Sequence, residues 1–298
     1  MNNSENFLEM YALSVQAARR QKMPGDISPI FPDITEDEER TDECCGTCSV
    51  SVLASDSGGN ATFIRCGRTK ILIDAGISAA CITERLKEHG IEPQSLDAVL
   101  VTHEHIDHVR GLKTLAKQYH LPIIATRGTL AGIDGGAAFV DNMQSITDDF
   151  TIGDVTVRPF AISHDAAEPC GFRIEGGYCC TIATDLGVVT ETVQHAMEGA
   201  DVLVLEANHD ADMLRQGSYP WPLKRRILSN RGHLANGDAA WALTRMKKYP
   251  RKVYLAHLSE ENNRPGLACD TVNDILASRG VVLDIEACLP QGGAEIIM

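Results

Sequence analysis

The sequence predicts an α/β protein in which two β-sheets pack face to face with helices on the outside. From residue 48 onward, many short runs rich in β-branched residues are separated by turn residues, which is typical of strands. Some runs alternate apolar and polar residues and others are apolar throughout, so the strands are of two kinds. The helical patterns between them are too few to connect all the strands in one parallel sheet, which favours two packed sheets.

The elements follow from these patterns in chain order. Strands are expected in SVSVLAS, ATFIRC and KILIDAG, then a helix near residues 79–89. DAVLV (97–101) predicts a buried strand, HVRGLKTLAKQYH (108–120) an amphipathic helix, and LPIIAT a further strand. The later strands are expected in FTIGDVTVRPFAIS, CGFRIEGG, YCCTIATD, ADVLVLEAN, KVYLAHLS and VVLDIEA, with helices at 188–199, 236–249 and 266–279. The blocks on either side of about residue 160 could form two similar halves.

Length and composition fit one large domain with an appendage. Of the 298 residues, 44% are hydrophobic, which is enough to build a core. Residues 1–47 look like an N-terminal extension, and residues 48–298 like the folded domain. No stretch approaches the roughly 18 uninterrupted apolar residues of a membrane span, and the N-terminus lacks a signal pattern. We therefore expect a cytoplasmic protein without a membrane partner, whose ten cysteines are reduced thiols.

Charge is distributed unevenly along the chain. The net charge of −14 argues at first against a nucleic-acid partner. However, residues 33–43 contain seven acids and one arginine, so much of the negative charge lies in the extension. Residues 213–252 contain ten lysines and arginines and a single acid, Asp238. Charge alone leaves open whether this basic segment is a solvated surface or a binding surface.

Residues 101–111 read VTHEHIDHVRG, directly after the apolar run DAVLV. His103, His105, Asp107 and His108 are thus crowded together at the end of a predicted buried strand. To bury such a cluster without partners would be very costly. Since imidazole and carboxylate groups are common ligands of transition metals, the cluster predicts a metal site.

Distant candidates for the same site also follow strands. His164 comes after VRPFAIS, Asp185 after CCTIAT, and His257 after KVYLA. Together with the cluster they make five imidazoles and two carboxylates, which suit two divalent cations such as zinc, manganese or iron. The other histidines considered lie within or beside predicted helices and are expected to be structural: His89, His120 and His195.

The arrangement closely resembles the metallo-β-lactamase superfamily, whose signature HxHxDH is matched by His103, His105, Asp107 and His108. The resemblance covers residues 48–298 and implies a four-layer αββα sandwich with a dinuclear site at one edge of its sheets. It implies that His103, His105 and His164 hold one metal. Asp107, His108 and His257 would hold the other metal, and Asp185 would bridge both.

Four further stretches look like the bacterial YycJ/WalJ branch of that superfamily, whose members resemble 5′→3′ exonucleases acting on DNA. They are VLASDSGGNATFI, LEANHDADML, SNRGHLAN and AHLSEENNRP. The first departs from the branch at Asp56 and Gly59, where glycine and serine are usual. A related branch, the tRNA 3′-processing nucleases, has a histidine in a GH motif that matches His233, and Glu206 is its natural partner. We predict Asp107, Glu206 and His233 as catalytic residues.

The remaining candidates concern the substrate. Ser57 and Asn60, with Ser55 and the backbone of Gly58, could offer donors to phosphate oxygens, although a tight turn alone would need similar residues. Asn208, His209 and Arg231 are further candidates for phosphate contacts; His209 could equally orient a ligand or brace its loop. The 213–252 segment would neutralise the DNA backbone, and Tyr219 and Trp221 could stack an unpaired base. Nothing indicates recognition of particular bases.

These patterns favour a dinuclear phosphodiesterase, a DNA exonuclease with little sequence preference, because two cations can clamp a phosphate for in-line attack. One alternative is hydrolysis of a small thioester, lactone or cyclic phosphodiester, which needs the same seven ligands but neither the GH histidine nor the basic segment. Another is a regulatory metal-binding protein without turnover. The sequence does not indicate the oligomeric state.

Overall fold

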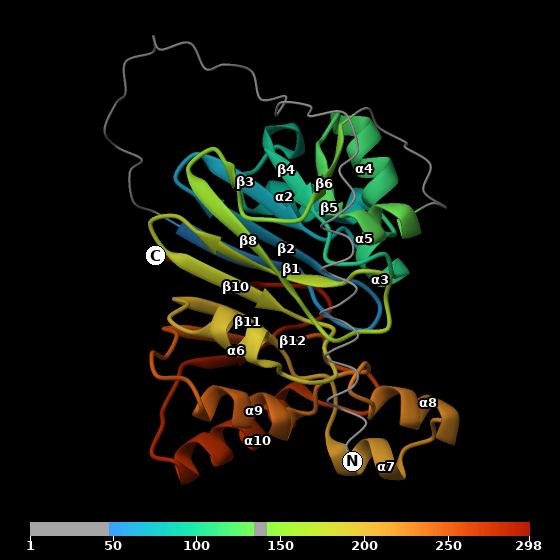
Figure 1. Ribbon diagram of the computed structural model, residues 1–298, viewed down its shortest axis with the longest axis vertical. Helices are drawn as coiled ribbons and strands as arrows, with labels where there is room; N and C mark the ends of the chain where they lie inside the picture. The colour runs from blue at the N-terminus through green and yellow to red at the C-terminus, as the bar shows by residue number, and fades with distance from the viewer. Residues whose placement is uncertain (1–47, 134–141) are drawn as a thin grey trace, which may run out of the picture. The chain divides into compact units, whose positions relative to one another are not determined.

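The computed structural model describes residues 48–133 and 142–298, so the predicted extension of residues 1–47 lies outside the described residues. Two seven-stranded sheets pack face to face, with helices on the outer face of each (Figure 1). This is the αββα sandwich that the sequence predicted. Within the described residues, no helix is both long enough and apolar enough to span a membrane.

The first sheet has the strand order β14-β1-β2-β3-β4-β5-β6. Its first four strands pair antiparallel, and the strands from β3 to β6 pair parallel. Most of its strands are buried, which explains the apolar runs in the sequence. The bounds are β1 Cys48–Ala54, β2 Ala61–Cys66, β3 Thr69–Ile73, β4 Ala98–Leu100, β5 Ile123–Thr126, β6 Met143–Ile146 and β14 Ala294–Ile297.

The second sheet has the order β13-β12-β11-β10-β9-β8-β7 and repeats this plan. Strands β7 to β10 pair antiparallel, and β10 to β13 pair parallel. The bounds are β7 Phe150–Ile152, β8 Val155–Ala161, β9 Cys170–Glu175, β10 Cys179–Ala183, β11 Val202–Glu206, β12 Lys252–Ala256 and β13 Ile285–Ala287. The chain changes sheets between β6 and β7, so the two similar halves are the two sheets, apart from β14.

The helices include those the sequence predicted and several shorter ones. Two differences from prediction are informative. The helix expected over 108–120 is split at Gly111, where an added side chain would lie 2.2 Å from the carbonyl oxygen of Ile77. Helix α7, which begins two residues before the basic segment, and helix α8, which lies within it, were not predicted. The bounds are α2 Ala79–Glu88, α3 Ile106–Val109, α4 Leu112–Tyr119, α5 Arg127–Gly132, α6 Glu191–Met197, α7 Ala211–Gln216, α8 Trp221–Ile227, α9 Asn236–Thr244, α10 Pro265–Ser278, with a 3₁₀ turn at Pro93–Ser95.

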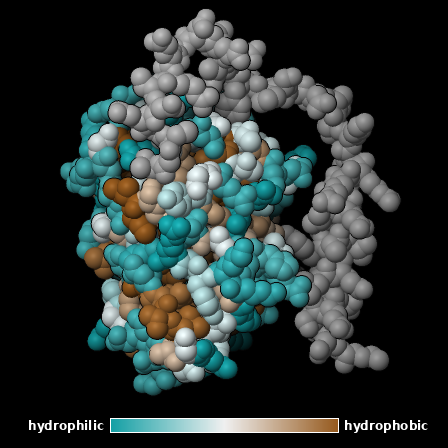
Figure 2. Space-filling view, turned by 90° about the vertical axis from the view of Figure 1, so that its left-hand side faces the viewer, coloured by the Kyte–Doolittle hydropathy of each residue, from teal (hydrophilic) through white to brown (hydrophobic). Residues whose placement is uncertain are grey.

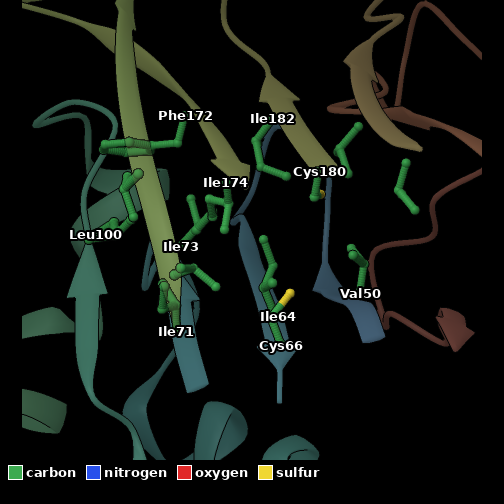
Figure 3. Close-up of a cluster of buried hydrophobic side chains, with 14 of the residues drawn as sticks. Val50, Ile64, Cys66, Ile71, Ile73, Leu100, Phe172, Ile174, Cys180 and Ile182 are labelled. Carbon is green, nitrogen blue, oxygen red and sulfur yellow. The ribbon is translucent and has the colours of Figure 1, made fainter. Parts of the chain in front are cut away.

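The core between the sheets is a layer of buried aliphatic side chains from both sheets (Figure 3). Val50, Ile64 and Ile73 from the first sheet share this layer with Phe172 and Ile182 from the second. Two further clusters lie between each sheet and its outer helices. This packing fixes the strand ends, and side chains that follow those ends are held in place by it.

One expectation about the cysteines was wrong. Cys48 and Cys66 lie opposite each other on β1 and β2 and form a disulfide, because the register pairs them directly. Six other described cysteines are free thiols, as expected.

The two ends of the strands differ in character. Helix α3, which carries part of the histidine cluster, lies on the right in Figure 1. The opposite face, shown in Figure 2, is largely hydrophilic with separate hydrophobic patches. The histidine cluster therefore lies on the side of the sandwich opposite to the face in Figure 2.

Candidate metal centre

The predicted site residues lie at the carboxyl ends of strands in both sheets. His103, His105, Asp107 and His108 follow β4, and the three distant candidates follow β8, β10 and β12. Among these, Asp185 and His257 have left-handed backbone conformations, with φ of 59° and 56°. Such a conformation costs a non-glycine residue about 1–3 kcal/mol and is typically retained where function requires it. Here it turns each side chain out of its strand toward the shared edge.

The first group of potential ligands is formed by three histidines. Nδ1 of His105 lies 3.1 Å from Nε2 of His103 and 3.2 Å from Nε2 of His164. The other ring nitrogens have their own partners: His103 Nδ1 lies 3.1 Å from Thr102 Oγ1, and His164 Nδ1 donates to Gly232 O at 3.3 Å. The nitrogens that face one another are thus the ones left for a cation.

The second group contains two carboxylates and two histidines. His108 Nε2 lies 3.4 Å from Asp107 Oδ2 and 3.2 Å from Asp185 Oδ2. His257 Nε2 lies 3.4 Å from Asp107 Oδ2. The second oxygen of Asp185 lies 4.0 Å from His164 Nε2, so this carboxylate faces both groups. The structure therefore brings all seven predicted ligands together and places Asp185 between the two groups.

A buried carboxylate that the sequence analysis did not single out supports the second group. Asp74 follows β3 and accepts a hydrogen bond from Nδ1 of His108 at 2.7 Å. Thr102 holds this carboxylate through its backbone N–H and its hydroxyl, both at 2.8 Å. An acid directly after the strand KILI could have suggested this role, because Asp185 is placed in the same way. Nearby, a side chain at Gly76 would collide with the carbonyl of Asp107, so the ligand loop can only pack against a glycine there.

Glu206, at the end of β11, is fully buried and supports two histidines. Its Oε1 accepts from Nδ1 of His233 at 2.8 Å and from Nδ1 of His257 at 2.9 Å. Its Oε2 accepts from the backbone N–H of Leu186 at 2.7 Å and of Leu234 at 3.3 Å. The pairing with His233 was predicted, whereas the bond to His257 was not. One carboxylate thus connects a potential metal ligand to the histidine of the GH motif.

The electrostatics of the centre favour positive charge. Burial would raise the pKa of Asp107 and Asp185, but the neighbouring histidines outweigh it and hold both pKa values below their usual range. Burial would lower the pKa of His108 and His257, but the carboxylates, Asp185 foremost, raise it. For His103, burial is decisive and lowers the pKa. The carboxylates are therefore anionic, and a cation beside them is stabilised.

The donor set fits divalent metal ions. His257 Nε2 and Asp185 Oδ2 are buried and have no hydrogen-bond partner among the described residues. In each of the two groups the ligand atoms lie within 4.8 Å of one another. Their closest separations are near the roughly 3.3 Å expected between donors that share a tetrahedral cation at 2.0–2.1 Å. Imidazole and carboxylate together suit borderline divalent cations.

Comparisons with known proteins decide the family. Residues 69–258 match the sequence family described as the beta-lactamase superfamily domain. Over 244 residues the chain is 38% identical to exodeoxyribonuclease WalJ of Streptococcus pneumoniae, covering 79% of this chain and 91% of the relative. It is 39% identical over 236 residues to exodeoxyribonuclease YycJ of Bacillus anthracis, covering 77% of this chain and 89% of the relative. The chain belongs to the WalJ/YycJ family of the β-lactamase superfamily.

The fold of this WalJ/YycJ family member is also that of solved structures. The metallo-β-lactamase fold protein YhfI of Bacillus subtilis superimposes with a TM-score of 0.65, covering 85% of this chain and 100% of YhfI. Because the sequence identity is 18%, this likeness concerns the fold alone. The fold class and the family resemblance predicted from the sequence are both confirmed.

The glycine-rich loop after β1 holds the centre together in this WalJ/YycJ family member. Ser55 Oγ accepts the backbone N–H of His257 at 2.8 Å. The amides of Gly58 and Gly59 are already bound by the side chain of Asp56, so these donors are not free for phosphate. Asn60 is buried beside the second group, with Nδ2 3.3 Å from His108 Nε2 and an Oδ1 that has no partner among the described residues. Ser57 is exposed at the rim of this loop.

The other predicted phosphate contacts are placed differently. Asn208 is buried and donates to the carbonyl of His257 at 2.8 Å. Arg231 donates to the carbonyl of His164 through Nε at 3.1 Å and Nη2 at 3.0 Å. Both side chains therefore support the backbone of potential ligands. His209 is 1% exposed, its ring nitrogens have no partner among the described residues, and burial lowers its pKa to about 4. Its phosphate contact stays a prediction.

Cations of the predicted basic segment lie in different parts of the domain, and the contact of this segment with DNA stays a prediction. Lys252 begins β12 and His257 follows its end, which separates them by roughly 16 Å along the strand. Lys252 pairs with Asp284 and Glu286 at the far end of that strand. Closer to the centre, Lys224 is buried and its Nζ donates to two backbone carbonyls. The cations left near the centre come from the end of α8 and the turn that follows it.

Proposed function

We propose that this protein is a 5′→3′ exonuclease that hydrolyses DNA with two divalent cations, zinc, manganese or iron, one in each group of ligands. The proposal is supported by relatives named exodeoxyribonucleases, which it matches over most of their length. The observation that carries it is the position of Glu206, whose Oε1 accepts from both His257 and His233. Thioester or lactone hydrolysis would not need this second histidine.

The proposed roles follow from the contacts of the side chains. When bound, the cations would polarise the phosphate and activate water. Since Glu206 accepts the Nδ1 proton of His233, Nε2 is the nitrogen available to the substrate, where it would give a proton to the departing oxygen. His233 is partly exposed, with 18% of its side chain accessible, and lies 3.8 Å from Asp185. Asp107 would act as a ligand and orient the second group.

The DNA strand would approach across α8 and the rim of the glycine-rich loop. Trp221 begins α8 and is 59% exposed, so it and Tyr219 could stack an unpaired base. Ser57 and Asn60 would lie beside the strand. Stacking on base faces, without contacts to base edges, gives little sequence preference. Contacts to the phosphates of the DNA backbone make binding depend strongly on salt. A cytoplasmic location would suit this substrate.

Product analysis with several substrates tests the function. The full-length protein, loaded with Mn²⁺ or Zn²⁺, is given 5′- or 3′-labelled DNA, bis-p-nitrophenyl phosphate and a thioester, with a chelated sample as control. We expect short products released from the 5′ end, metal-dependent cleavage of the phosphodiester, and no thioester turnover. Thioester hydrolysis without DNA cleavage would support the small-molecule alternative instead. Metal binding without turnover of any substrate would support a regulatory role.

A further inference from the structure

One wall of the first ligand group is built from two segments, residues 163–165 and residues 226–232. His164 donates to the carbonyl of Gly232, and Arg231 donates twice to the carbonyl of His164. The bond from His164 is buried, and the two bonds from Arg231 are partly buried. Together they join the two segments beside the ligand group.

At the outer end of this wall lies an ion pair with different properties. Asp165 accepts from Arg226 Nε at 2.6 Å and from Arg226 Nη2 at 3.2 Å. The two side chains are 33% and 53% exposed. An exposed ion pair of this kind contributes only about 0–1 kcal/mol to stability, so it can exchange at little cost. The bonds of His164 and Arg231 that join the two segments do not involve this pair.

The pair also lies directly beside the metal centre. Asp165 Oδ1 is 3.5 Å from His164 Nε2, which is the nitrogen that faces the other ligands of the first group. The pKa of Arg226 is raised, chiefly by its bond with Asp165 and further by the charge of Asp107 in the second group. The guanidinium is thus held beside the first group by Asp165, with about half of its side chain exposed to solvent.

We propose that Arg226 binds a phosphate of the DNA strand at the mouth of the metal centre, and that Asp165 holds the guanidinium there until substrate replaces the carboxylate. This inference rests on the proposed nuclease function and names a substrate-binding residue for it. A guanidinium can bind phosphate through two parallel hydrogen bonds, in the same geometry that it now uses for Asp165. Lys224 and Arg231, the neighbouring cations, already donate to backbone carbonyls.

A matched control exists on the same helix. Arg225 precedes Arg226 on α8, is exposed, and has no hydrogen-bond or ion-pair partner among the described residues. Consecutive helical residues point about 100° apart, so Arg225 is directed away from Asp165. Replacing either arginine removes one positive charge from α8. Only Arg226→Ala removes the charge that is paired with Asp165 beside the first ligand group.

The test compares Arg226→Ala, Arg225→Ala and Asp165→Asn in the metal-loaded, full-length protein. Loss of a charge-assisted contact should raise KM for DNA roughly 10- to 100-fold in Arg226→Ala. The slope of log(kcat/KM) against the logarithm of salt concentration should become shallower by about one. Arg225→Ala removes a charge from the same helix without removing the paired contact, so it should raise KM several-fold less than Arg226→Ala does. Asp165→Asn, which frees Arg226, should lower KM roughly two- to fivefold. Metal content and Tm are measured for each variant.

The decisive result is that KM changes in opposite directions in Arg226→Ala and Asp165→Asn. If the ion pair only stabilised the two segments, Arg226→Ala and Asp165→Asn would both raise KM and the salt dependence would not change. This result would overturn the inference. If Arg226→Ala fails to fold, Arg226→Lys keeps the charge without the paired geometry, and a KM equal to wild type would overturn the inference as well. If the wild-type protein cleaves no DNA, the proposed function itself fails. If it does cleave DNA and the variants match it, only this inference fails.

Discussion

The two halves of the sandwich contribute to the metal centre in different ways. The first half provides four potential ligands from one short segment after β4, a loop that runs into helix α3, so their positions depend on each other. The second half provides His164, Asp185 and His257 singly, each after a different strand. A loop can place neighbouring residues by local geometry, whereas separate strands can only do so through the register of the whole sheet. The first half thus provides a set of potential ligands that are neighbours in the chain. The second half adds the remaining three from separate strands and completes the centre.

The halves also differ in how they support their histidines. In the first half, Asp74 accepts from one ligand, His108. In the second half, Glu206 accepts hydrogen bonds from the potential metal ligand His257 and from His233, which is not one of the seven potential ligands. The carboxylate of the first half therefore supports only a potential metal ligand, and that of the second half links a potential ligand to the proposed proton donor.

The largest effect is expected where the halves meet, at Asp185. Asp185→Asn removes the charge of a carboxylate that faces both groups, so metal should be lost from both. DNA cleavage should fall by more than the roughly 100-fold typical of residues that only support ligands. Elemental analysis and cleavage assays measure both quantities. Asp274→Asn, on the exposed side of α10, is the control and should behave as wild type. Full activity in Asp185→Asn would mean that the centre is wrongly assigned.

A smaller effect distinguishes the two supporting carboxylates. Glu206→Gln and Asp74→Asn should each weaken metal binding or activity by about 10- to 100-fold. At saturating metal, however, Asp74→Asn should recover most of its cleavage rate, because only a ligand was disturbed. Glu206→Gln should stay slow, because His233 has also lost its partner.

His233→Ala separates the two functions of Glu206. It should keep its metal and lose cleavage by about 10²- to 10⁴-fold, the range for a positioned proton donor. Chelator competition gives the metal affinity, and single-turnover cleavage gives the rate. Equal recovery of Glu206→Gln and Asp74→Asn at saturating metal would contradict the division of roles between the halves.

The same contrast explains what the sequence could predict. The loop VTHEHIDHVRG was interpretable because its ligands are neighbours in the chain, and the fold class followed from the strand patterns. His164, Asp185 and His257 became candidates through their shared position after strands. The bonds of Asp74 to His108 and of Glu206 to His257 could not be predicted, since they depend on how β3 and β11 align with their neighbours.

The basic segment shows the opposite case, in which a local pattern says little about spatial arrangement. Its ten cations are close in sequence, and their contact with DNA stays a prediction. The structure sends Lys252 to the far end of β12 and buries Lys224. Charge counted along a chain ignores the direction in which each element points, which only the packed fold determines.

The smallest predicted effect concerns His209, a buried histidine of the second half that belongs to none of the groups able to hold metal. Burial lowers its pKa from the ordinary 6.5 to about 4. As pH falls through this range, the unfolded chain takes up a proton that the folded protein excludes, so the free energy of unfolding decreases. Between pH 7 and pH 5 this residue alone should cost the wild-type protein about 2 kcal/mol.

Urea unfolding of wild type and His209→Leu, both in chelator, measures this contribution. The free energy of unfolding should fall less steeply with decreasing pH in His209→Leu, by about 2 kcal/mol between pH 7 and pH 5. His195→Leu, at an exposed position of α6, controls for the loss of a histidine. A parallel decline in wild type and His209→Leu would show that His209 finds a proton acceptor in the folded protein. In that case the second half would contain one more polar contact than its hydrogen bonds indicate, and His209 would be a candidate to exchange protons with the Glu206–His233 pair.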